Sequence, residues 1–178
     1  QEIGEAPYNF FGLSLGGLTA LAIAYHYPKL VKKVCAGASS ITQLSHKRMN
    51  LFPLINILLM NLEPVGPIFP HKKIGKFLVS KHFLEEHPEL VDIWDRLWIQ
   101  QKLSKKNFFK QMVSALFSLT PSMLKKIKVP ALILSGEEDQ LVPFENSELI
   151  KNCIPNSAHI SFPRTGHDLT TEHPELVA

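Results

Sequence analysis

Apolar residues in the first part of the chain fall into short runs and one longer stretch. The runs at Tyr8–Phe11 and Val31–Ala38 predict buried strands. The stretch Leu18–Tyr27, rich in alanine and leucine, predicts a helix that ends before Pro28. A strand, a helix and a second strand in this order are typical of a parallel sheet with crossover helices. The pattern therefore predicts an α/β fold.

The same pattern returns near the end of the chain. Strands are predicted at Val129–Leu134 and Ala158–Phe162, with a helix at Glu145–Cys153 between them. A further helix is predicted to start at Glu172–Val177. We therefore expect residues 1–40 and 121–178 to form one core.

Residues 41–120 lack comparable strand signals. Apolar side chains recur at helical spacing from Leu90 to Trp98, after Pro88, and from Phe108 to Phe117, after Ser104. Such stripes usually pack in a core, and their other side could line a pocket. We expect this segment to be a helical insertion that forms a cap or lid.

Composition and charge limit the classes of partner. The 178 residues are 45% hydrophobic, the formal net charge is +3, and the lysines are scattered in pairs without long runs. We therefore expect no nucleic-acid or membrane partner. The cysteines, Cys35 and Cys153, form no disulfide framework, which favours reduced thiols and a cytoplasmic protein. A targeting segment, if the protein has one, would lie upstream of Gln1.

The strongest chemical signal is Gly12-x-Ser14-x-Gly16, which lies between the first predicted strand and the helix. A tight strand-to-helix turn lifts the serine hydroxyl clear of the sheet as a nucleophile, and side chains at both glycines are expected to collide with that turn. The backbone N–H of Leu15 then becomes a candidate oxyanion-hole donor at the helix start. The alternative interpretation is a glycine-rich turn in which Ser14 caps the helix.

A serine nucleophile needs a general base and an acid that orients it. His167 is the favoured base because it follows the strand Ala158–Phe162, at the sheet edge where catalytic groups of open α/β sheets collect. The loop after Val129–Leu134 supplies the acid, with Asp139 as candidate.

Other carboxylates compete with Asp139 for this role. Glu137 and Glu138 lie in the same loop and remain close rivals, whereas Asp168 is discounted because it adjoins His167. Neither metal-ligand spacing nor a phosphate-binding loop occurs, so no metal and no cofactor are expected.

Three stretches resemble the α/β-hydrolase superfamily: Phe10–Gly17, Ile127–Pro143 and Gly166-His167. The resemblance implies a mostly parallel sheet with flanking helices and a helical cap. It also favours Asp139 over Glu138 as the acid, from its place between the glycine and the Val-Pro pair of the second stretch. The pattern of these three stretches is similar to that of small carboxylesterases, enol-lactonases and carbon–carbon bond hydrolases, which act on small molecules.

Parts of the family pattern are missing from this sequence. The family has several strands before the elbow, one of which leads to the second oxyanion donor, and a full helix after the position of Ala178. We therefore expect the N-terminal part of the sheet to be absent. An unpaired sheet edge would invite pairing with another chain or a second copy.

The sequence as a whole predicts a serine hydrolase that cleaves an ester, thioester or lactone through an acyl-enzyme on Ser14. The substrate would be a small acyl compound. Two alternatives stay open: a carbon–carbon bond hydrolase with the same triad, and a truncated or ligand-binding relative with weak catalysis.

Overall fold

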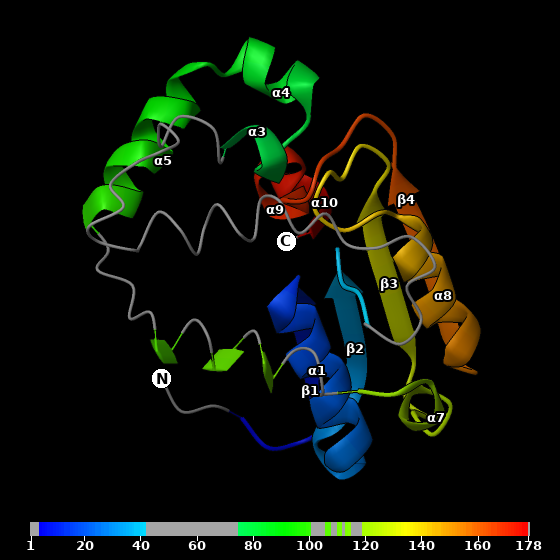
Figure 1. The fold of residues 1–178 in the computed structure, drawn as a ribbon. Coiled ribbons are helices and arrows are strands. Elements are labelled where there is room, and N and C mark those ends of the chain that lie inside the picture. Colours follow the sequence, from blue (N-terminus) through cyan, green and yellow to red (C-terminus); the bar gives the residue numbers. More distant parts are fainter. Residues whose placement is uncertain are drawn as a thin grey trace.

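Four parallel strands form the centre of the molecule, in the order β1-β2-β3-β4 (Figure 1). The computed structural model describes residues 4–41, 75–100, 106–107, 110–111, 113–114 and 119–177. The strands are β1 (Tyr8–Leu13), β2 (Val31–Gly37), β3 (Ala131–Gly136) and β4 (Ser157–Phe162). The predicted α/β fold is therefore confirmed, and the carboxyl ends of all four strands meet at one edge of the sheet.

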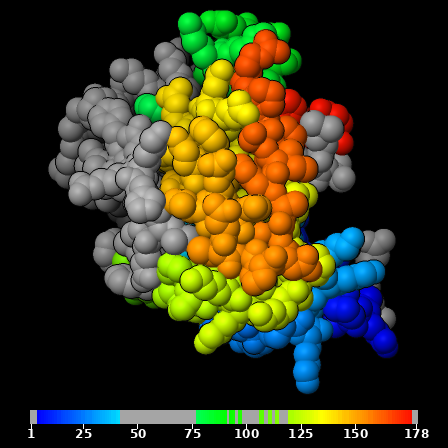
Figure 2. Space-filling view, turned by 90° about the vertical axis from the view of Figure 1, so that its right-hand side faces the viewer, coloured from blue at the N-terminus to red at the C-terminus, as the bar shows by residue number. Residues whose placement is uncertain are grey.

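Two helices pack on the sheet and build its core. Helix α1 (Leu15–His26) lies against β1 and β2, and α8 (Glu145–Cys153) lies against β3 and β4. Leu21, Ile133 and Ile150 are fully buried between these layers. The short helices η1 (Pro28–Leu30) and α7 (Pro121–Leu124) close the amino-terminal end of the sheet (Figure 1). In the side view, the residues from α7 to β4 form one continuous surface (Figure 2).

Helices also form in the predicted insertion. They are α3 (Gly75–Leu78), α4 (Lys81–Glu86) and α5 (Glu89–Gln100). The helix predicted from the Leu90–Trp98 stripe is thus confirmed, although Ile93 and Leu97 are 38% and 49% exposed and do not pack in a core. Of the second predicted helix, only residues 106–107, 110–111 and 113–114 are described, and these are helical. The rest of that stripe lies outside the described residues.

The end of the chain differs from the prediction. In place of one helix from Glu172, two short helices follow the His167 loop, α9 (Leu169–Glu172) and α10 (Pro174–Val177). They are separate because Pro174 has no N–H with which to continue α9, while its fixed φ suits a first helical turn. No helix in the described ranges has the length and apolar character needed to cross a bilayer.

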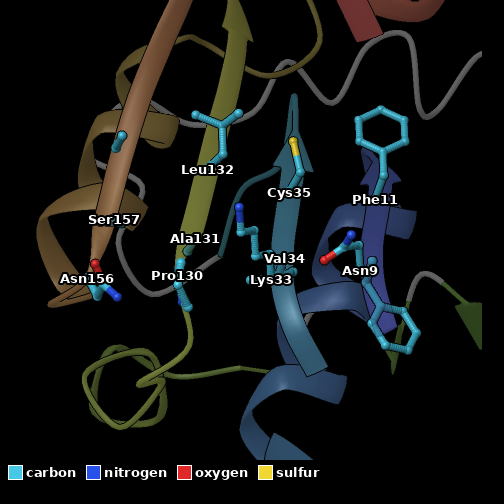
Figure 3. A pocket seen from close by; sticks show the side chains of 12 residues that line it. Asn9, Phe11, Lys33, Val34, Cys35, Pro130, Ala131, Leu132, Asn156 and Ser157 are labelled. Atoms are coloured by element: carbon cyan, nitrogen blue, oxygen red, sulfur yellow. The ribbon is translucent and has the colours of Figure 1, made fainter. Parts of the chain in front are cut away.

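The sheet face opposite α1 and α8 is partly open. A hollow of about 610 Å³ lies along the amino-terminal halves of the strands, and the side chains of Phe11, Cys35 and Leu132 stand in one row across it (Figure 3). Phe11 is 46% exposed there. Within the described residues β1 pairs with β2 alone, so its other edge is unpaired. None of its lining residues belongs to the last two positions of a strand, so the hollow does not include the carboxyl edge of the sheet.

Candidate active site

The residue between β1 and α1 has a strained backbone. Ser14 has φ 54° and ψ −118°, a region that non-glycine residues rarely occupy. Its N–H donates to the carbonyl of Gly37 at the end of β2 (2.7 Å), and its carbonyl accepts the N–H groups of Gly17 (3.0 Å) and Leu18 (3.2 Å). The elbow predicted from the sequence is therefore present, with Ser14 half-buried at the carboxyl edge of the sheet.

The glycine requirement differs from the prediction at one position. A Cβ on Gly12 would lie 2.2 Å from the backbone of Gly16, so glycine is needed there as expected. A Cβ on Gly16, by contrast, would meet no described atom within 4 Å, and the expectation that it would collide is wrong. The reason is that Gly16 already belongs to α1, where its Cβ would point away from the sheet. The second sterically required glycine is Gly17, whose Cβ would lie 2.2 Å from Ser39 Oγ.

Ser39 supports the elbow and was missed by sequence reasoning. Its buried hydroxyl lies within hydrogen-bonding distance of two carbonyl oxygens, those of Ser14 (2.9 Å) and Gly37 (3.0 Å). It therefore ties the end of β2 to the residue that carries the candidate nucleophile. A serine directly after a buried strand is the signal in the sequence, but nothing in that signal names Ser14 as the partner.

Asp139 and His167 form a buried pair at the same edge. His167 Nδ1 lies 2.7 Å from Asp139 Oδ2, and the side chains are 7% and 0% exposed respectively. The other carboxylate oxygen, Asp139 Oδ1, accepts the N–H groups of Leu141 and Val142, each at 2.8 Å. Because an ionised carboxylate can only accept hydrogen bonds, this contact requires the proton on His167 Nδ1, which in the neutral ring leaves Nε2 as the acceptor.

Two of the rival carboxylates have other partners, and the third is exposed. Glu137 is exposed and accepts the hydroxyl of Ser161 (2.8 Å), and Glu138 is exposed as well. Asp168 caps α9, where its carboxylate accepts the hydroxyl of Thr171 (2.7 Å). Among the described residues, no hydrogen bond or ion pair joins any of the three carboxylates to the imidazole of His167.

Gly37 connects the nucleophile side of the site to the histidine side. A Cβ on Gly37 would lie 3.1 Å from Leu13 Cδ1 and 3.3 Å from Leu169 Cδ1. These leucines come one residue before Ser14 and two residues after His167, so both loops reach the same glycine. No hydrogen bond joins Ser14 Oγ to His167 among the described residues. Such catalytic contacts are often long without substrate and tighten on binding.

The backbone around Ser14 leaves a donor for an anion. Within the described residues, no backbone hydrogen bond uses the N–H of Leu15, the first residue of α1. A free N–H at a helix start favours negative charge beside it. This group is the predicted oxyanion donor. In the part of the chain that is described, no cluster of His, Cys, Asp and Glu side chains could hold a metal ion.

The remaining described histidines are engaged elsewhere. His159 Nε2 lies 2.8 Å from the Ser135 hydroxyl under α8, and burial lowers the pKa of His159, which Glu148 partly opposes. His173 contacts Thr165 Oγ1 at 2.8 Å. The exposed side chains of His82 and His87 pair with nearby glutamates, and His26 packs edge-on against Tyr25. His46 and His71 lie outside the described residues.

Comparison with known proteins identifies this architecture. Residues 1–174 match the family described as serine aminopeptidase, S33. The chain belongs to this family of α/β-hydrolases. The chain spans 61% of the length of the uncharacterized hydrolase YugF from Bacillus subtilis, with 29% identity over 174 residues and 94% of the chain covered.

A further relative and a solved structure are also similar to the chain. The chain is 25% identical over 187 residues to the monoacylglycerol lipase ABHD6 of Bos taurus, covering 99% of the chain and 54% of that lipase. Its fold resembles the enol-lactonase from Burkholderia xenovorans, with a TM-score of 0.77, 17% identity and coverage of 96% and 62% respectively. The chain therefore spans less than two thirds of each of these proteins.

Proposed function

We propose that the protein is a serine hydrolase that cleaves small acyl compounds through an acyl-enzyme on Ser14. The observation that carries the proposal is the buried Asp139–His167 pair, 2.7 Å apart, at the same sheet edge as the strained Ser14 elbow. A nucleophile, a base and an acid that orients the base are the minimum for this chemistry. The roles follow from the geometry of each residue.

The reaction begins with the hydroxyl of Ser14. Its Oγ attacks the substrate carbonyl carbon while His167 Nε2 takes the hydroxyl proton, and the negative charge moves to the carbonyl oxygen beside the Leu15 N–H. Asp139 stabilises the imidazolium that forms. When the tetrahedral intermediate collapses, the leaving group receives the proton from Nε2 and the acyl-enzyme remains. The same nitrogen then deprotonates a water molecule, whose oxygen attacks the acyl carbon. When the bond from that carbon to Ser14 Oγ breaks, Oγ takes the proton back from Nε2, which releases the acid and restores Ser14.

The class of substrate is inferred from chemistry and from one relative. The proposed cycle accepts an ester, a thioester or a lactone, because each offers a carbonyl with an oxygen or sulfur leaving group. The named activity of ABHD6, a monoacylglycerol lipase, is an ester cleavage and favours a carboxylic ester. Helices α3–α5 would then belong to the cap that borders the acyl pocket, as the insertion pattern predicts.

A fluorophosphonate probe tests this proposal. The probe forms a stable bond only to an activated serine, so the intact wild-type protein should be labelled and Ser14→Ala should not. Ser122→Ala, which removes an exposed serine within α7, is the matched control and should label like the wild type. Labelling of Ser14→Ala equal to that of the wild type would refute the role of Ser14. Hydrolysis rates on ester, thioester and lactone substrates would then rank the substrate classes.

A further inference from the structure

Glu172, at the end of α9, binds two parts of the chain at once. Its Oε1 accepts the backbone N–H of Gly166 (2.7 Å) and that of Ser80 (2.9 Å). Its Oε2 accepts the Ser80 hydroxyl (2.6 Å). Gly166 directly precedes His167, and Ser80 directly precedes α4. One carboxylate therefore joins the loop of the candidate base to the segment Leu78–Ser80.

The same two segments are in contact on the other side of His167. The N–H of Asp168 donates to the carbonyl of Leu78 at 2.6 Å. At Gly166 the backbones pack so closely that a Cβ would lie 2.6 Å from the carbonyl carbon of Val79. Val79 and Ser80 are 2% and 1% exposed. Asp168 is thus bonded directly to Leu78, while Gly166 packs against Val79 and reaches Ser80 through Glu172. Figure 1 shows α3 and α9 side by side.

The bonding of Glu172 differs from that of a surface ion pair. No salt bridge in the described part of the chain includes Glu172, and its three donors are two backbone N–H groups and one hydroxyl. Hydrogen bonds to a carboxylate are about twice as strong as neutral ones, and backbone donors hold it in a fixed geometry. The bridge fixes main-chain positions on both of its sides.

We propose that Glu172 is a positioning residue for the reaction: its bridge between Gly166 and Ser80 holds His167 in place against the helices that follow Ser80. The inference rests on the proposed function of Ser14 and His167. Asp139 fixes only the Nδ1 side of the imidazole, so the direction of Nε2 depends also on where the backbone of residue 167 lies. The bond from Asp168 to Leu78 and the bridge from Gly166 through Glu172 hold the backbone on both sides of residue 167, and with it the direction of Nε2.

Kinetics of fluorophosphonate labelling test the bridge, because the maximal labelling rate constant and the half-saturating probe concentration are separate quantities. The variants are Glu172→Ala, which removes the bridge, and Glu172→Gln, which keeps its shape. The amide oxygen of glutamine can still accept both N–H groups, and its NH₂ can donate to Ser80 Oγ. Glu175→Ala is the control, since Glu175 is an exposed acid three residues away whose closest ionic partner is His173 (3.7 Å).

We expect Glu172→Ala to lower the maximal rate constant by about 10- to 100-fold, because a misplacement of about 1 Å costs up to that much in rate. The half-saturating concentration should change less than about threefold, since the bridge does not border the probe. Glu172→Gln should recover most of the rate and Glu175→Ala all of it. The inference would be overturned if Glu172→Ala were labelled as fast as the wild type. It would also be overturned if Glu172→Gln were labelled as slowly as Glu172→Ala.

A second pair of variants covers the case in which Glu172→Ala does not fold, as judged by its thermal unfolding. Ser80→Ala removes the hydroxyl donor and should lower the rate constant about 2- to 10-fold, whereas Ser80→Thr keeps the hydroxyl and should not. Equal rates for Ser80→Ala and the wild type would count against the bridge. A wild type that is not labelled at all would refute the proposed function instead, so the two failures are distinguishable.

Discussion

Ser39 Oγ occupies the space that a side chain at Gly17 would need, 2.2 Å from the position of its Cβ. The same hydroxyl is hydrogen-bonded to the carbonyl of Ser14. Because Gly17 has no side chain, there is room for the Ser39 hydroxyl that supports Ser14. The second glycine required at the elbow is therefore one position further along the chain than the G-x-S-x-G motif indicates.

Gly17→Ala should destabilise the protein by about 1–3 kcal/mol, the usual cost of overpacking a well-packed site. It should also slow labelling of Ser14, because Ser39 must move away from the Ser14 carbonyl. Urea unfolding measures the first effect and fluorophosphonate kinetics the second. Gly16→Ala is the control: it meets nothing within 4 Å of the described atoms and should be neutral or more stable by up to about 1 kcal/mol. Equal stability of the two variants would contradict the assignment.

Much of this fold could be predicted because its elements depend on local pattern. The helix Glu145–Cys153 agrees at both ends, and the strands are found where apolar runs occur. The shift of β3 to Ala131–Gly136, from the predicted Val129–Leu134, has a backbone reason. Pro130 has no N–H, so the first donor available to β4 is Ala131, which bonds the carbonyl of Asn156 at 2.9 Å.

The site was predictable only in part. Gly12, Ser14, Asp139 and His167 carry motif signals, and each lies near the carboxyl end of a strand or in the loop that follows it. The supports from Ser39 and Glu172 carry no such signal, because they depend on two segments that meet only in the folded chain. Ser80 and Glu172 are 92 residues apart in sequence, and no local spacing relates them.

Asp139→Asn should abolish most of the activity while leaving the fold intact. The asparagine oxygen would accept the Leu141 and Val142 N–H groups, and its NH₂ would face His167 Nδ1. His167 would then hold its proton on Nε2, the wrong tautomer, and the labelling rate constant should fall by about 10⁴-fold. Glu138→Gln, an exposed carboxylate in the same loop, serves as the control and should label normally. A comparable loss of labelling rate in Glu138→Gln would contradict the assignment of Asp139 as the acid that orients His167.

Gly136→Ala should separate the loops that carry the acid and the base. A Cβ there would lie 2.1 Å from the carbonyl oxygen of Gly166 and 2.3 Å from that of Thr165, and backbone atoms cannot move aside cheaply. We expect a loss of about 3 kcal/mol in unfolding free energy and slower labelling, because the Asp139 loop is displaced from the His167 loop. Gly4→Ala, with no described atom within 4 Å, is the control. Wild-type stability and rate in Gly136→Ala would contradict this close packing.

Cys35 lies in the row of side chains across the open face of the sheet, and its thiol should react slowly with alkylating agents. Burial raises its pKa from 9.0 to about 11, so at pH 8 roughly one molecule in a thousand carries the reactive thiolate.

We expect iodoacetamide to modify Cys35 about 100-fold more slowly in the folded protein than in the urea-unfolded chain at pH 8, with a rate that rises about tenfold per pH unit up to pH 10. Mass spectrometry of the Cys35 peptide measures both rates. The raised pKa also implies stability that is present below about pH 9 and lost as the pH rises through about 11, because the unfolded chain releases the thiol proton first. Equal modification rates in the folded and unfolded protein would show that the thiol is not shielded.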